Sequence, residues 1–217
     1  MIKNIIFDVD GVLRNLTNSP LLEILSERVK EKIPDEFKNM TTSDFYRKFC
    51  KHSYPPYLDY DKGLITENEF IGSLNKDFGV DKDFAKEVFE YRCRPDMQIF
   101  YEPTFKLAKK LKSEGYKLYI LSNMGKSLTN TLRKLMDITL FDGIAFSSEV
   151  HHMKPHKDIY EHAISMFNIS PDESIFVDDR EDNLEPFKGL GGHTFLFDYK
   201  NLNETIIKLE KFIKSEI

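Results

Sequence analysis

The sequence has few cysteines, and this narrows the kinds of site it can hold. Only Cys50 and Cys93 occur among its 217 residues. They lie far apart and match no spacing of a metal or redox site, so we expect a reduced, intracellular protein, although a disulfide between them stays open.

Long apolar runs are also absent. The first apolar run, at Ile5 to Phe7, is cut short by Asp8, so the N-terminus does not resemble a signal peptide. No stretch approaches the length needed to cross a bilayer. We therefore expect a cytoplasmic protein without a membrane partner.

Net positive charge is missing as well. The 36 acidic residues outnumber the 31 basic ones, which gives a net charge of −5. No overall field then attracts nucleic acid, so a nucleic-acid partner is not expected. A phosphorylated substrate would need positive charge placed locally.

The stretch around which the chain is organised lies at its start. Ile5 to Phe7 form a short apolar run, typical of a strand buried on both faces of a parallel sheet. Asp8, Asp10 and the turn residue Gly11 follow directly. Ligands of α/β proteins gather at the carboxyl ends of strands, and two carboxylates this close need a cation. Mg²⁺ suits them because it prefers oxygen ligands.

A long helical pattern follows this motif. Leu21, Leu25 and Val29 recur at helical spacing, and a capping box at residues 66–69 begins a helix that Gly79 ends. We predict a small helical bundle, residues 15–94, inserted as a cap over the site. Within it, residues 54–60 are interpreted as a stiff aromatic connector between helices, with substrate contact as the alternative.

From Pro95 onward, helices and strands alternate. Strands are predicted at residues 117–121, 143–146, 174–177 and 193–197, with helices between and after them. This alternation predicts a parallel sheet with right-handed crossovers. The predicted fold is therefore α/β: a Rossmann-like, three-layer core made of residues 1–14 and 95–217, with the helical cap inserted.

Polar residues follow the predicted strands where each one ends. A parallel sheet would bring them to one edge, with a lysine near the same rim: Asp8, Asp10, Ser122, Asn123, Asp178, Asp179 and Lys154. In this order, and in the forms Asp-Val-Asp-Gly-Val, Ser-Asn, Lys-Pro and Asp-Asp, they resemble the motifs of the haloacid dehalogenase-like (HAD) hydrolases. The resemblance covers essentially the whole chain, because the helical insert occupies the cap position of that family.

The resemblance implies a role for each residue of the first motif. Asp8 would be the nucleophile and form an aspartyl-phosphate, since an ionised carboxylate is already nucleophilic at neutral pH. Asp10 would protonate the leaving alcohol and then activate water. The dehalogenases of the family lack this second aspartate, so Asp10 indicates phosphate chemistry.

The resemblance also implies a metal site. Mg²⁺ would be bound by the side chain of Asp8, the main-chain carbonyl of Asp10 and the side chain of Asp179. Asp178 and Asn183 would support these ligands without touching the metal. The order of Asp178 and Asp179 stays open, and Asn183 has a plain helix-start role as its alternative.

Phosphate binding is assigned in the same way. Ser122, Asn123 and Lys154 would contact the transferring phosphoryl group, against the alternatives of a polar turn and a solvated lysine. The sequence departs from the family at His151 and His152, where many relatives have a glycine. We interpret the two histidines as a surface pair, with contact to substrate or to Lys154 as the alternative.

Together these features predict a Mg²⁺-dependent phosphatase acting on a small phosphorylated metabolite, for example a sugar phosphate. A phosphomutase of the β-phosphoglucomutase type, and a non-catalytic binding or regulatory protein of the same fold, are the alternatives. Arg14 is only a guess at a substrate contact. The physiological substrate and the oligomeric state are not readable from the sequence.

Overall fold

The structure of the chain is a computed structural model that describes residues 1–16, 18–51 and 53–215. Residues 17 and 52, which belong to the predicted insert, lie outside this description. The strands are β1 (Asn4–Phe7), β2 (Arg14–Leu16), β3 (Gln98–Phe100), β4 (Lys117–Ser122), β5 (Gly143–Phe146), β6 (Ser174–Asp178) and β7 (His193–Leu196). The helices are α1 (Leu21–Ile24), α2 (Glu27–Lys30), α3 (Asp35–Lys38), α4 (Thr42–Phe49), α5 (Pro55–Asp61), α6 (Glu67–Phe78), α7 (Lys82–Cys93), α8 (Glu102–Ser113), α9 (Lys126–Leu135), α10 (Ser147–Val150), α11 (Lys157–Phe167), α12 (Glu181–Gly189) and α13 (Leu202–Ser215).

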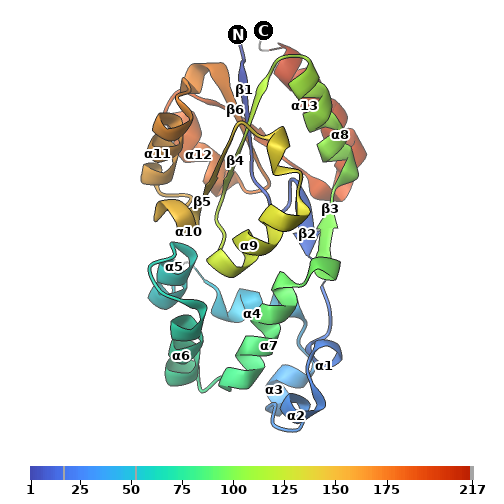
Figure 1. Cartoon of the computed structure of the whole chain (residues 1–217), viewed down its shortest axis with the longest axis vertical. Coiled ribbons are helices and arrows are strands. Elements are labelled where there is room, and N and C mark those ends of the chain that lie inside the picture. The colour runs from blue at the N-terminus through green and yellow to red at the C-terminus, as the bar shows by residue number, and fades with distance from the viewer. Residues whose placement is uncertain (17, 52, 216–217) are drawn as a thin grey trace.

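A five-stranded parallel sheet in the order β5-β4-β1-β6-β7 forms the core. Successive side chains of a strand point to opposite faces, so Ile5 and Phe7 pack with helices α8, α9 and α13. Ile6 packs on the other face with α11 and α12 (Figure 1). The predicted three-layer α/β fold is therefore confirmed, and the strands begin and end close to the predicted residues.

Helices α1 to α7 lie beyond the carboxyl ends of the strands, in the lower half of Figure 1. They enclose an apolar cluster of their own that is rich in aromatic rings. Phe70 at its centre is fully buried, with its ring stacked on Tyr60 at 5.1 Å and edge-on to Phe89 at 5.6 Å. The helix α6 begins at the predicted capping box of Thr66 and ends at Gly79, whose φ is 68°.

The junction between these helices and the core differs from the prediction. Helical structure was expected from residue 15, but Arg14 to Leu16 form strand β2, which pairs antiparallel with β3. The two crossings of the chain between the core and the helices therefore run side by side as a ribbon. Strands of three residues are too short to leave an alternating pattern in the sequence.

The first predicted helix is also divided. Leu21, Leu25 and Val29 are all buried, but Leu25 is extended, with φ −86° and ψ 148°, between α1 and α2. The break is fixed by Ser26, whose main-chain N–H and hydroxyl both donate to the carboxylate of Glu87, at 2.7 Å each. The helical periodicity thus identified the buried residues but not the interruption.

The sequence interpretation of residues 54–60 as a connector between helices is wrong, because most of them are helical. Helix α5 spans most of them and begins at Pro55, a position where proline's missing N–H costs nothing. Both cysteines are free. Among the described residues, no helix has the length and apolar character required to cross a membrane.

Replacing Phe70 with alanine tests the helical cluster. Because the ring is fully buried among other rings, Phe70→Ala should lower the free energy of unfolding by about 3–5 kcal/mol. The same change at Phe78, in the same helix but 52% exposed, should cost only about 1 kcal/mol. Urea unfolding measures both, and equal losses would contradict the packing described.

Candidate active site

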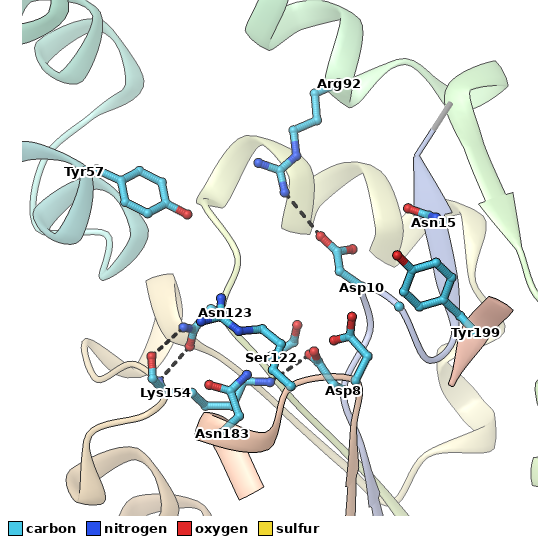
Figure 2. A pocket seen from close by; sticks show the side chains of 13 residues that line it. Asp8, Asp10, Asn15, Tyr57, Arg92, Ser122, Asn123, Lys154, Asn183 and Tyr199 are labelled. Carbon is cyan, nitrogen blue, oxygen red and sulfur yellow. Dashed lines mark hydrogen bonds and ion pairs between the residues drawn. The ribbon is translucent and has the colours of Figure 1, made fainter. Parts of the chain in front are cut away.

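The predicted site residues meet at the carboxyl edge of the sheet. Phe7 pairs with Ile120 of β4 and with Val177 of β6, so the residues that follow these three strands lie next to one another. They surround a cavity of about 260 Å³ (Figure 2). The cavity is lined by Asp8, Asp10, Gly11, Asn15, Tyr57, Arg92, Ser122, Asn123, Lys154, Asp179, Arg180, Asn183 and Tyr199.

Three carboxylates at this edge could share a metal ion. One oxygen each of Asp8, Asp178 and Asp179 lies within 4.8 Å of the others. Gly11 permits the approach of Asp179, since its φ is 81° and a Cβ on it would lie 2.4 Å from the Asp179 Cγ. A cluster of hard oxygen donors fits Mg²⁺.

The two adjacent aspartates have different surroundings. Asp178 is fully buried and accepts hydrogen bonds from Lys154 Nζ at 2.6 Å, from the Arg180 main-chain N–H at 2.9 Å and from Asn183 Nδ2 at 3.0 and 3.1 Å. Asp179 is less buried and lines the cavity. This arrangement favours Asp179 as the direct ligand, with Asp178 and Asn183 behind it, and the assignment stays a prediction.

Lys154 supplies the positive charge of the cavity floor. Its side chain is 1% exposed, and its Nζ lies 2.9 Å from Asp8 Oδ1 as well as 2.6 Å from Asp178 Oδ2. Burial alone would lower the pKa of Lys154, but Asp178 and Asp8 outweigh it and raise that pKa. The main chain of Lys154 is held by the side chain of Asn123 through two hydrogen bonds of 2.8 Å. A phosphate contact from Asn123 would therefore have to come from its main chain.

Two acids of the cavity, Asp8 and Asp179, are shifted toward their protonated forms. Burial raises the pKa of Asp8 to about 7, and Asp178 adds to the shift, although Lys154 opposes it. Burial, and then Asp178, raise the pKa of Asp179 to about 6. Ionised carboxylates at this site therefore need a further cation to be stable.

Asp10 lies between two arginines. Its Oδ1 is 2.5 Å from Arg14 Nη2, and its Oδ2 is 3.2 Å from Arg92 Nη2. Arg14 is completely buried and also donates from Nη1 to Gln98 Oε1 at 2.7 Å. The guess that Arg14 contacts substrate is therefore wrong in this structure, since it does not line the cavity and instead holds Asp10.

The two histidines lie away from the cavity. His151 is exposed, and its Nδ1 is 2.8 Å from the Lys62 carbonyl oxygen, which follows α5. His152 lies 3.9 Å from Asp158 and 5.5 Å from the ring of His162. Neither lines the cavity, which fits the surface-pair interpretation.

Sequence reasoning missed the residues that the helices contribute. Arg92 in the last turn of α7 and Tyr57 in α5 both reach the cavity (Figure 2). The aromatic stretch around Tyr57 was noted but interpreted as a connector. Nothing in the sequence marks Arg92, because a basic residue at a helix end is common for reasons of the helix dipole alone.

Comparisons with known proteins agree with this geometry. A sequence model of the haloacid dehalogenase-like hydrolases matches residues 2–191. Pyrophosphatase PpaX of Bacillus cereus is 23% identical over 194 residues, which are 89% of this chain and 82% of that protein.

Among solved structures, a HAD family enzyme of Bacteroides thetaiotaomicron was crystallised as an aspartate-to-alanine mutant with magnesium and inorganic phosphate. It is 25% identical, with a TM-score of 0.69 over 91% of this chain and 94% of that one. A HAD-like family hydrolase of Porphyromonas gingivalis, 23% identical, has the same fold, with a TM-score of 0.70 over 97% and 98% of the two chains.

The raised pKa values predict how stability depends on pH. Asp8 and Asp179 have pKa values above those in the unfolded chain, so without metal the stability they give at low pH should be lost progressively as the pH rises from about 4 to about 6 to 7. Mg²⁺ binds the ionised forms, so it should raise the melting temperature more at about pH 8 than at about pH 5.5.

Thermal melts with and without Mg²⁺ at both pH values measure this. Asp179→Asn should reduce the Mg²⁺-dependent shift, whereas Asp35→Asn, on the exposed surface of α3, should keep it. A shift that is the same at both pH values would contradict the prediction.

Proposed function

The chain belongs to the haloacid dehalogenase-like hydrolase family, and we propose that it is a Mg²⁺-dependent phosphatase acting on a small phosphorylated substrate. The observation that carries the proposal is the floor of the cavity, where Asp8 lies 2.9 Å from Lys154 and within 4.8 Å of Asp179. This proximity supports the proposed role of Asp8 as the nucleophile, with Lys154 as a fixed cation and Asp179 as a candidate metal ligand beside it. A relative named as a pyrophosphatase, and a structural neighbour bound to magnesium and phosphate, support phosphate chemistry.

In the proposed reaction, two carboxylates carry out the chemical steps. An oxygen of Asp8 attacks phosphorus, and the bond from phosphorus to the leaving oxygen breaks as Asp10 gives that oxygen a proton. The phosphoryl group is then carried on Asp8. Asp10 next takes a proton from water, which attacks phosphorus and breaks the bond to Asp8, releasing phosphate. When bound, Mg²⁺ would neutralise the charge shared by the phosphoryl oxygens and the carboxylates.

The remaining residues hold the reacting groups. Lys154 keeps its ammonium at Asp8 and can contact a phosphoryl oxygen, and Ser122 at the end of β4 lines the same wall. Arg14 fixes Asp10 from the side away from the cavity. The cavity volume of about 260 Å³ is below the range of roughly 300–1,000 Å³ typical of drug-sized ligands, which favours a small substrate.

Hydrolysis of an aryl phosphate tests the proposal. Release of phosphate should require Mg²⁺ and be lost with a chelator. Asp8→Asn should lower kcat by at least about 1,000-fold, because the nucleophile is gone. Asp10→Asn should lower it by about 100- to 10,000-fold, the usual contribution of a general acid and base.

Asp35→Asn again serves as the matched control and should keep full activity, since the side chain is exposed on α3. A fully active Asp8→Asn enzyme would overturn the mechanism. A strict requirement for a sugar bisphosphate would instead indicate a phosphomutase. Pyrophosphate belongs in the substrate panel because of the activity named for the Bacillus relative.

A further inference from the structure

Arg92 is a charged residue of the cavity that the proposed reaction does not use. It lies in the last turn of α7 and enters the cavity from the helical side, above Asp10 (Figure 2). Its side chain is 21% exposed. Behind it, the ring of Tyr46 in α4 lies 4.7 Å from the centre of the guanidinium. The arginine is therefore held by stacking from one side while its other side faces the cavity.

The charge of Arg92 is not needed to neutralise Asp10. Arg14 already pairs with that carboxylate at 2.5 Å, and Arg14 cannot leave it cheaply because it is completely buried. Arg92 makes the longer contact, at 3.2 Å. One carboxylate thus faces two guanidinium groups, and the partner at the shorter distance is Arg14.

One donor of Arg92 also lacks a hydrogen-bond partner among the described residues. This donor is its buried Nε. A guanidinium has five N–H groups in a fixed fork, and a buried donor without an acceptor is costly. Asp61 is a second buried carboxylate close enough for Arg92 to lower its pKa, which burial nevertheless raises to about 6. Within the described ranges, Asp61 forms no ion pair with Arg92.

The position of Arg92 indicates which part of a substrate it would meet. The phosphoryl group is expected in the cavity beside Asp8 and Lys154, and the leaving oxygen beside Asp10. Arg92 lies on the far side of Asp10 from Asp8 in Figure 2. Whatever is attached to the leaving oxygen therefore extends toward the guanidinium.

We propose that Arg92 binds a second anionic group, a carboxylate or another phosphate, on the leaving part of the substrate. This inference rests on the proposed phosphatase function and adds the chemical class of the substrate. A planar anionic group matches the guanidinium fork, which Tyr46 holds in one orientation. A neutral, sugar-like leaving group would offer the guanidinium no anionic partner.

A matched pair of substrates tests the proposal. Phosphoglycolate and 2-hydroxyethyl phosphate differ only in ending with a carboxylate or a hydroxymethyl group, and pyrophosphate offers a phosphate in that place. Hydrolysis of each is measured in Mg²⁺ for the wild type, Arg92→Gln and Arg92→Lys. Arg94→Gln is the matched control, because Arg94 is exposed, lies two residues further along and pairs with Asp96 outside the cavity.

Any effect of Arg92→Gln through Asp10 should be shared by all substrates, whereas kcat/KM for the anionic substrates should fall about 10- to 100-fold further than for 2-hydroxyethyl phosphate, mainly through KM. Arg92→Lys, which keeps the charge but not the fork, should recover part of the loss. Arg94→Gln should behave as the wild type. Whether phosphoglycolate or pyrophosphate loses more identifies the kind of anion.

Equal losses on all substrates would overturn the proposal, because Arg92 would then act only through Asp10. Loss of selectivity in Arg94→Gln would overturn it too, since a general field would then suffice. If the wild type hydrolyses neither these substrates nor an aryl phosphate, the proposed function fails instead. Calorimetry then tests Arg92 by measuring the affinities for phosphonoacetate and 2-hydroxyethylphosphonate. The wild type should bind phosphonoacetate more tightly than 2-hydroxyethylphosphonate, and Arg92→Gln should lose this preference. The same preference in both proteins would refute the proposal.

Discussion

The ammonium group of Lys154 is the contact on which the cavity floor depends. It joins Asp8, which follows β1, to Asp178, which ends β6, in a position that is 1% exposed. Breaking a buried ion pair by removing one partner is costly, because the other charge is left unpaired in a medium that solvates it poorly. The pairing therefore fixes the spacing of the two strand ends at which a metal and a phosphoryl group would meet.

The same charge balance explains why a further cation would be stable at the cavity floor. Lys154 supplies one positive charge against the three carboxylates Asp8, Asp178 and Asp179, and burial already drives two of their pKa values up. A divalent ion would let all three ionise together. The carboxylate oxygens of Asp178 accept hydrogen bonds from the protein. The carboxylates that could contact solvent, metal or substrate are therefore those of Asp8 and Asp179.

The core was predictable from the sequence because its pattern is local. A buried strand appears in the sequence as an apolar run. The polar residue that follows the run can then be assigned to the sheet edge from the local pattern alone. The ribbon of β2 and β3 was not predictable, since each strand has only three residues and their pairing joins distant positions, such as Leu16 and Gln98, which are 82 residues apart. The role of Arg92 escaped for the same reason, because its partner Asp10 lies 82 positions away. Arg14 has Asp10 four residues away, but its second partner, Gln98, is 84 positions distant.

Those missed residues form one connected network. Asp10 pairs with Arg14, which donates to Gln98, and Gln98 Nε2 in turn donates to the main-chain oxygen of Arg92 at 2.8 Å. The side chain of Arg92 then returns to Asp10. The network passes through the ribbon, the sole pair of strands joining core and helices in the described part of the chain. A shift of α7 relative to the sheet would therefore move Arg92 and also disturb the contacts that hold Asp10. In the proposed reaction, recognition of the leaving group by Arg92 and the position of Asp10 thus depend on the same contacts.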